Sequence, residues 1–363
     1  MRLPLRAVPV CLSLSLAGAT PAQAGRPPGL VHARLDTRSA AAGLEEVARR
    51  WAAAQAEPAW LAYEVPAAGE HEMCCFDSVG SAAGPRAGSG CRIERHGSFT
   101  MRDGEERAPL LDDENAIVLL RAEQGRVARV RVVSRGCGLD AGGRSFTWIE
   151  DVEPVSSLRL LSSFVGAGTE EGKKDKLSDG AIMAVAVHAG TAADETLERF
   201  LDPSRPVGVR KQAAFWMGNL RGRRGYEALS RLVRDDPSEK VREHGVFALG
   251  QSAVPEAVGA MIRVARQDPS AHVRGQALFW LGQKAGGQAR AAIARALEDD
   301  PETDVKKKAV FALSQLPKDE GVPLLIEVAK TNRNPEVRKQ AMFWLGQSRD
   351  ARALAFFEDV LAR

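Results

Sequence analysis

The chain repeats itself every 32 residues from Val209 onward. The five copies read VRKQAAFWMG at 209, VREHGVFALG at 241, VRGQALFWLG at 273, VKKKAVFALS at 305 and VRKQAMFWLG at 337. A fixed period of this length indicates a stack of two-helix units, in which each unit buries its apolar side against its neighbours. Because an open stack presents a long surface and has no obligatory catalytic pocket, the repeat favours a binding or scaffolding function.

The eighth residue of the repeat alternates between alanine and tryptophan. One earlier unit, LSDGAIMAVA from Leu177, keeps the same spacing of small and apolar residues, so we expect six units over 177–363. The alternating residues are Ala184, Trp216, Ala248, Trp280, Ala312 and Trp344. We interpret the alternation sterically, with each tryptophan filling space that alanine leaves on the next helix, because protein interiors are close-packed. A stripe of three exposed tryptophans that serves as a ligand platform is the alternative.

A phenylalanine stands at the seventh position of five units. These residues are Phe215, Phe247, Phe279, Phe311 and Phe343. At 100° per residue they lie about 120° from the centre of the core-facing stripe of the first helix. A helix that is apolar over so wide an arc is normally covered on several sides. The phenylalanines therefore either pack between units or form an exposed aromatic seam that docks a partner.

The turns of the units also recur. Asp-Pro pairs at 202, 236, 268 and 300 end one helix and begin the next, because proline suits only the first turn of a helix. An amide residue follows the end of each first helix. These amides, Asn219, Gln251, Gln283, Gln315 and Gln347, could satisfy the backbone groups of the turns from unit to unit.

The unit as a whole resembles the HEAT repeat, in the short bacterial form similar to phycobilisome-lyase-type repeats. The resemblance rests on an Asp-Pro turn, a Val-Arg or Val-Lys pair five residues later, a small residue and then Leu-Gly or its equivalent, and it covers about half of the chain. In that family the Asp and the Arg six residues later link successive units. The resemblance thus implies links through Asp236, Arg242, Asp268, Arg274, Asp300 and Lys306, whereas Asn332 before Arg338 and Ser204 before Arg210 depart from the pattern.

The resemblance is informative about fold and less so about function, because such repeats occur in scaffolds, adaptors, lyases and one class of di-iron hydroxylase. The hydroxylases use His-Glu pairs on their repeats as iron ligands. No His-Glu pair occurs in the repeats of this chain, which argues against that activity.

The first 24 residues have the pattern of a secretory signal peptide. Arg2 and Arg6 precede an apolar stretch from Ala7 to Ala19, and Ala22-Gln23-Ala24 is a small-x-small cleavage site. The stretch is too short to span a membrane. We therefore expect cleavage near Ala24 and a periplasmic or secreted protein, with no membrane insertion afterwards.

Cleavage would lower the formal charge from +3 to +1, because the segment has two arginines and no carboxylate. This charge gives no electrostatic footprint for nucleic acid or an anionic membrane. We expect a monomer whose partner is another protein.

Residues 26–165 are expected to form an α+β domain with an antiparallel sheet, ahead of the all-α HEAT-like solenoid at 177–363. Helical spacing over 40–56 places Leu44, Val47, Ala48 and Trp51 on one face. Strands are expected at 59–65, 70–76, 91–99, 116–122 and 126–134, several with period-2 alternation. A helix is expected at 154–165. The charged run 166–176 would then be a linker, or else the entry loop of the stack.

The four cysteines of the mature chain, Cys74, Cys75, Cys91 and Cys137, all lie in this first domain. An even count in an exported chain favours two disulfides. Because adjacent residues of a strand point to opposite faces, Cys74 and Cys75 are each expected to bond to Cys91 or Cys137. The alternatives are a redox-active pair or a zinc site. The zinc site would draw on His71, Cys74, Cys75, Cys91 and His96.

Catalytic motifs are absent from the sequence. It has no Gly-x-Ser-x-Gly, His-Glu-x-x-His, Walker loop or dinucleotide fingerprint, so no catalytic residue or cofactor is predicted. His71-Glu72 beside the paired cysteines is the one polar cluster that suggests chemistry. A metal-binding or enzymatic first domain around His71, with the solenoid as a docking arm, is therefore the alternative to a pure scaffold.

The binding surface is expected on the second helices of the units. In a HEAT-like stack the first helices are expected on the convex side and the second helices in the concave groove. The second helices also differ most between copies, as in VPEAVGAMIRVARQ and GVPLLIEVAKTN. Charged groups there tune recognition and encounter rate. The candidate contacts are Arg263, Arg266, Arg295, Glu298, Glu327 and Lys330.

Overall fold

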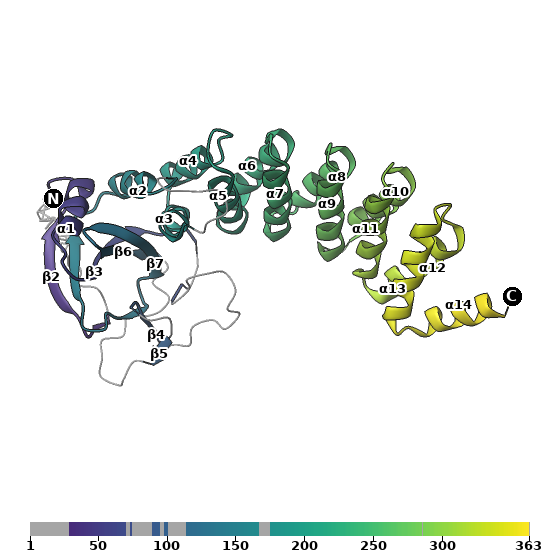
Figure 1. Cartoon of the computed structure of the whole chain (residues 1–363), viewed down its shortest axis with the longest axis horizontal. Coiled ribbons are helices and arrows are strands. Elements are labelled where there is room, and N and C mark those ends of the chain that lie inside the picture. Colours follow the sequence, from purple (N-terminus) through teal and green to yellow (C-terminus); the bar gives the residue numbers. More distant parts are fainter. Residues whose placement is uncertain are drawn as a thin grey trace, which may run out of the picture.

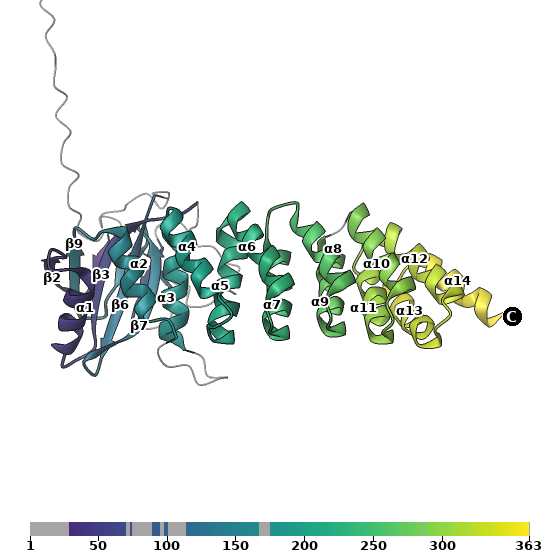
Figure 2. The ribbon, with the colours of Figure 1, turned by 90° about the horizontal axis from the view of Figure 1, so that it is seen from above.

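A computed structural model of the chain describes residues 29–69, 73–74, 89–94, 98–100, 114–166, 175–284 and 286–362. It shows a two-sheet α+β region followed by a row of helical hairpins (Figures 1 and 2). This agrees with the predicted fold class. In the described part of the chain, no helix has the length and apolarity that a membrane span needs.

The larger sheet has five strands in the order β2-β9-β3-β6-β7. Its strands are β2 (Arg34–Ser39), β9 (Ser145–Glu150), β3 (Ala59–Pro66), β6 (Asn115–Glu123) and β7 (Arg126–Ser134). The predicted strands at 59–65, 116–122 and 126–134 correspond to β3, β6 and β7, and these three are antiparallel as expected. The β6–β7 hairpin turns at Gln124 and Gly125, both of which have positive φ.

The antiparallel prediction fails at the other edge of this sheet, where β2, β9 and β3 run parallel. The reason is the helix α1 (Leu44–Ala53) between β2 and β3, because a helical crossover brings the chain back in its original direction. Strand β9 then inserts between them. Strand β2 was not predicted because all of its residues are exposed, so it lacks the alternation of buried and exposed positions.

The smaller sheet has the order β1-β8-β4-β5. Its strands are β1 (Leu30–Val31), β8 (Gly138–Asp140), β4 (Ser89–Arg92) and β5 (Ser98–Thr100). The predicted strand 91–99 is thus two short strands with a bend at Ile93 and Glu94. In the predicted strand 70–76, Met73 and Cys74 lie outside any strand, and the remaining residues fall outside the described ranges. A small apolar core that includes Trp60, Phe146 and Leu139 joins strands of the two sheets.

The helices α1, α2 (Pro154–Ser163) and α3 (Lys176–Val187) pack on the larger sheet (Figure 2). Leu44, Ala48 and Trp51 of α1 are buried, as the helical spacing predicts. Helix α3 lies very close to β7, since a Cβ added at Gly180 would be 2.2 Å from the Val130 oxygen. A single apolar core consequently continues from the sheet into the helical row. The α+β region therefore covers the first end of the row, where a solenoid needs a cap.

Six hairpins follow one another from α3 to the end of the described chain (Figure 1). Their remaining helices are α4 (Thr191–Phe200), α5 (Val207–Leu220), α6 (Gly222–Asp235), α7 (Glu239–Gln251), α8 (Ala257–Gln267), α9 (Ala271–Lys284), α10 (Gly287–Asp299), α11 (Thr303–Ser314), α12 (Lys318–Thr331), α13 (Pro335–Ser348) and α14 (Ala351–Leu361). The odd-numbered members, which contain the repeated decapeptide, are the first helices of their units.

The row curves toward its first helices, so α5, α7, α9, α11 and α13 line the concave side (Figure 1). The expectation that the second helices form the concave groove is therefore wrong. The physical reason is glycine. A Cβ added at Gly218 would lie 2.4 Å from the Ala248 oxygen, and one at Gly282 would lie 2.9 Å from the Ala312 oxygen. Neighbouring first helices can therefore touch backbone to backbone, whereas neighbouring second helices meet at few points, and the row bends toward its tighter layer.

Candidate functional site

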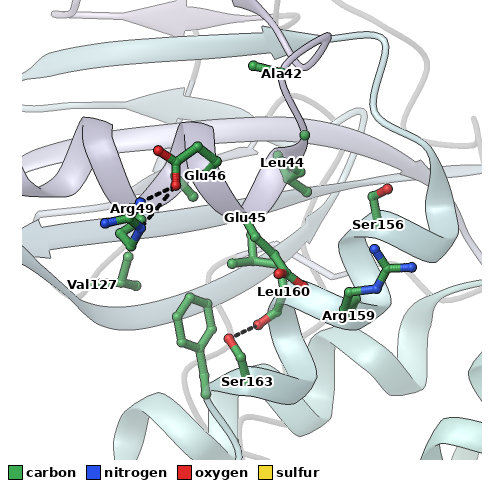
Figure 3. Close-up of a pocket in the computed structure, with 13 residues that line it drawn as sticks. Ala42, Leu44, Glu45, Glu46, Arg49, Val127, Ser156, Arg159, Leu160 and Ser163 are labelled. Atoms are coloured by element: carbon green, nitrogen blue, oxygen red, sulfur yellow. Dashed lines mark hydrogen bonds and ion pairs between the residues drawn. The ribbon is translucent and has the colours of Figure 1, made fainter.

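A cleft of about 530 Å³ lies between α1 and α2 in the α+β region (Figure 3). Glu45, Glu46 and Arg49 line it from α1, and Ser156 and Arg159 line it from α2. Glu46 forms an ion pair with Arg49, and the Arg49 guanidinium holds the pKa of this half-buried carboxyl below its usual value. No histidine or cysteine lines the cleft. Ser156 therefore has no histidine beside it in the cleft that could activate it as a nucleophile.

The three cysteines that the structure describes are disulfide-bonded. Cys74 is bonded to Cys137, one of the two partners expected for it, and the distance of 5.4 Å between their Cα atoms is usual for a disulfide. Cys91 is also disulfide-bonded, to a partner outside the described residues. A zinc site would need thiolates at Cys74 and Cys91, and a disulfide provides none. His71, Cys75 and His96 lie outside the described ranges, and within those ranges no group of three potential ligands is placed to hold a metal.

A buried polar chain joins the sheet to the first repeat. His188, at the end of α3, donates from Nδ1 to the Ala184 oxygen at 2.7 Å, and its Nε2 lies 2.9 Å from Ser157 Oγ. Ser157 in turn hydrogen-bonds to Tyr63 Oη at 2.9 Å. Burial lowers the pKa of His188 to about 4 and raises the pKa of Tyr63. His188, Ser157 and Tyr63 have no exposed surface, so no substrate can reach them. These hydrogen bonds therefore stabilise the junction between the sheet and the first repeat.

The two other histidines of the repeats occupy different environments. His244 is half-buried, with its ring centre 5.3 Å from that of Phe247, and burial lowers its pKa to about 4. His272 is exposed and lies 3.1 Å from Glu243. The structure therefore brings none of His188, His244 and His272 into a ligand set within the described residues.

A ladder of buried ion pairs connects the repeats. Arg242 donates to both carboxylate oxygens of Asp268, at 2.8 and 3.0 Å, and to the main-chain oxygen of Asp236 at 3.1 Å. The carboxylate partner is thus the Asp 26 residues later, in the next turn, while the Asp six residues earlier contributes its backbone. The same carboxylate contact joins Arg210 to Asp236 and Arg274 to Asp300.

The ladder stops at Lys306, one of the six residues that the family resemblance indicated. Lys306 donates to the main-chain oxygen of Glu298 at 2.9 Å, because the position that would offer it a carboxylate is Asn332. Arg338 likewise donates to the main-chain oxygen of Asn332. Arg210 does take part, although Ser204 breaks the pattern before it, since its carboxylate comes from the following unit.

The six charged residues proposed as partner contacts all lie exposed on α8, α10 and α12. They are Arg263, Arg266, Arg295, Glu298, Glu327 and Lys330. The structure places these helices on the convex side of the row (Figure 1). Lys330 Nζ lies 5.5 Å from the ring centre of Phe356. Among the described residues, the other five side chains make no hydrogen bond or ion pair, so they are solvated and spread over three repeats.

The tryptophans pack between first helices. The Trp280 ring lies against α7, so that a Cβ added at Gly250 would come within 2.8 Å of it. The alanines Ala184, Ala248 and Ala312 have no exposed surface, and Trp216 is buried too, whereas Trp280 and Trp344 are partly exposed. The geometry agrees with the steric interpretation of the alternation between alanine and tryptophan.

The phenylalanines stack along the concave side between the tryptophans. Phe215 stacks on Phe247 with ring centres 6.0 Å apart, and Phe279 stacks on Phe311 at 5.8 Å. Trp280 connects the two pairs, with its ring centre 5.2 Å from that of Phe247 and 5.0 Å from that of Phe279. Trp344 connects Phe311 to Phe343, at 4.9 and 5.1 Å. The first four phenylalanines are half-buried and Phe343 is 54% exposed. The rings therefore both pack between units and form a continuous seam on the surface.

Polar side chains flank this seam. We define the inner face as the third, fourth, seventh and eleventh repeat positions on α5, α7, α9, α11 and α13, counted from Val209 and its equivalents. The eleventh position gives a row of exposed amides, in which Gln283 Nε2 donates to Gln315 Oε1 at 3.3 Å. Within the described part of the chain, Asn219 alone among these amides bonds to backbone, through Nδ2 to the Phe215 oxygen at 2.8 Å. The amides are therefore open to a ligand rather than committed to the turns. The sequence indicated the phenylalanines and the amides of this face, but the groove was expected on the other layer of helices.

The comparison with protein families decides what the row is. A model described as HEAT repeats matches residues 193–282, 226–301 and 289–363. The C-terminal half of the chain consists of HEAT repeats. This confirms the resemblance seen in the sequence, and the α+β region lies outside the match.

Several solved HEAT-like structures are similar to the chain. Human deoxyhypusine hydroxylase shares 16% identity over 57% of this chain and 90% of its own, with a TM-score of 0.25. YibA of Escherichia coli shares 18% over 57% and 75%, with a TM-score of 0.34. The CpcE–CpcF complex of phycocyanin lyase from Nostoc shares 19% over 57% and 80%, with a TM-score of 0.32. Among curated protein sequences, none matches.

Proposed function

We propose that this protein is an exported, non-enzymatic scaffold that binds another protein through its HEAT-repeat row. The observation that supports it best is the inner face, where an unbroken seam of aromatic rings is flanked by exposed amides over five repeats. HEAT repeats are typical of protein-binding scaffolds, and aromatic surface of this extent is unusual on a face without a partner.

The row is built to hold this face in a fixed shape. Its repeats share one apolar core with the α+β region, and buried pairs such as Arg242 with Asp268 lock neighbouring turns together. A rigid surface loses little conformational entropy on binding, which favours affinity. The α+β region serves in this proposal as the cap and the anchor of the row.

Export is supported by two features of the chain. Arg2, Arg6 and the apolar stretch that ends at Ala19, followed by Ala22-Gln23-Ala24, fit a cleaved signal peptide. The Cys74–Cys137 disulfide suits an oxidising compartment such as the periplasm or the extracellular space.

Retention of a partner from envelope extract tests the proposal. The mature chain is used as bait, and retained proteins are identified by mass spectrometry. We expect a defined partner that the wild type and the outer-face variant Arg263→Glu/Arg266→Glu/Arg295→Glu retain equally. A variant with substitutions on the inner face should not retain this partner. Loss with the outer-face variant alone would move the site to the convex charged residues. Specific retention of no protein would contradict the scaffold function.

The alternative of a metal-binding or enzymatic region around His71 is tested on the same purified protein. We expect almost no free thiol and no zinc after purification without chelator. Four titratable thiols with stoichiometric zinc would favour the alternative.

A further inference from the structure

We propose that the inner face is a receptor for an extended, acidic polypeptide segment that lies along the row across the first helices. The inference rests on the proposed scaffold function and specifies the chemistry of its partner. It is carried by three properties of the face: its charge, its amide row and the spacing of its aromatic seam.

The charge of the inner face is basic. Its positions hold four lysines, Lys211, Lys307, Lys308 and Lys339, against the single carboxylate Glu243. Lys307 Nζ lies 3.4 Å from Asp304 Oδ1, and Glu243 Oε1 lies 3.1 Å from His272 Nε2. Lys308 and Lys339 are exposed and have no carboxylate partner among the described residues. The exposed carboxylates Asp304 and Glu336 lie one turn before these lysines, so the net charge of α11 and α13 on this side is smaller but still positive. A segment with carboxylates at one end would complement it.

The position of Lys308 is fixed by its stem. Its Cγ packs against α9, where a Cβ added at Gly275 would lie 3.1 Å from it. Packing of the stem leaves only the charged end of the side chain in solvent. Less side-chain freedom is then lost when a carboxylate is bound.

The amide row favours an extended occupant over a helical one. Asn219, Gln251, Gln283, Gln315 and Gln347 recur once per repeat, are exposed, and each has both donors and an acceptor. An extended chain has unpaired backbone N–H and C=O groups that such amides can bind, whereas a helix has already satisfied its own. Main-chain recognition of this kind does not depend on the partner's sequence.

The aromatic seam sets the length of the occupant. Packed helices lie about 8–10 Å apart, so the four intervals between the five first helices span roughly 32–40 Å, which matches about 10–12 extended residues at about 3.3 Å each. Alternate side chains of an extended segment point to one side. Apolar residues at those positions would lie on the rings, and acidic residues would reach Lys308 and Lys339.

Selection from a random library of 12-residue peptides displayed on phage tests the proposal with the folded mature protein. We expect selected peptides to be enriched in Asp and Glu over the starting library, with apolar residues at every second position. Synthetic copies should bind about tenfold more weakly to Lys308→Glu/Lys339→Glu than to the wild type, and this difference should shrink as added salt screens the charges. The matched control Arg263→Glu/Arg295→Glu changes the net charge equally on the outer face and should bind like the wild type. Circular dichroism melting checks that both variants fold.

The amide row is tested separately by Gln283→Ala/Gln315→Ala, which should weaken all selected peptides by a similar factor whatever their sequence. Selection of basic peptides, a 3.6-residue apolar period that indicates a helix, or equal binding to the lysine variant would overturn the proposal. Failure to enrich any peptide would do so too. If a protein partner is nevertheless retained from extract, the scaffold function stands and only the acidic extended segment is wrong.

Discussion

At the scale of single residues, the buried groups are more informative than the exposed ones. His188 has no exposed surface and is held neutral between the Ala184 oxygen and Ser157. Its place in the junction could not be predicted from sequence, because Tyr63, Ser157 and His188 are far apart in the chain and each is unremarkable in its own segment. Only the packing of α2 and α3 on the sheet brings them together.

His188 makes stability depend on pH. Its pKa falls from 6.5 to about 4 on folding because burial disfavours the charged ring. The unfolded chain therefore takes up a proton below pH 6.5 that the folded protein does not, and stability is lost as the pH falls from about 6.5 toward 4. We expect a loss of about 2 kcal/mol between pH 7 and pH 5 from this residue, measured by urea unfolding.

The variant His188→Gln should be less stable at pH 7 but show a flatter decline toward pH 5. The exposed His272→Gln is the matched control and should keep the slope of the wild type. Equal slopes for all three proteins would mean that His188 is protonated in the folded state.

At the scale of elements, the first helices were predictable and their position in the row was not. The period, the alternation of Ala248 with Trp280 and the family resemblance all came from residues that recur in register. The side toward which the row curves depends instead on interhelix distances, which are set by which glycines face a backbone. Gly218 and Gly282 face the backbone of the next first helix. Gly346 occupies the same repeat position, but a Cβ added there would have no atom within 4 Å.

This difference predicts opposite effects for the same substitution. Gly282→Ala places a Cβ 2.9 Å from the Ala312 oxygen and should cost about 1–3 kcal/mol, because α9 and α11 must separate. Gly346→Ala should stabilise α13 by up to about 1 kcal/mol, because alanine is the better helix former. Denaturant unfolding of the two variants checks the pair, and similar effects of both would show that the close helix contact is unimportant.

The ion-pair ladder gives a second prediction for the row. Arg242→Ala leaves Asp268 buried without its partner, which should cost about 3–5 kcal/mol. Lys306→Ala, at the equivalent position where no carboxylate is offered, should change stability by less than about 1 kcal/mol. A small loss for Arg242→Ala would place Asp268 in contact with water.

At the scale of the whole molecule, the α+β region and the repeats form one continuous body. The sequence indicated two domains with a possible linker, because composition changes near residue 166. The close contact of Gly180 with Val130 instead seats the first repeat on the sheet. The mixed strand order also escaped prediction, since the pairing of β9 between β2 and β3 joins segments more than 80 residues apart.

The disulfides provide a test of the exported state. Peptide mapping of the non-reduced mature protein should recover Cys74 linked to Cys137, which leaves Cys75 for Cys91 as the second predicted pair. The mapped chain should begin after Ala24 if the signal peptide is cleaved as proposed. Free thiols at Cys74 and Cys137 would contradict the bond.

Binding on the inner face is the central claim, and site-specific photo-crosslinking measures it most directly. A photoreactive residue is placed at Gln283 on the inner face or, in the control, at Arg295 on the outer face, and the mature protein is irradiated in its own compartment. We predict a crosslinked partner from Gln283 and none from Arg295. A crosslink from Arg295 with none from Gln283 would show that the concave aromatic seam is not the binding surface.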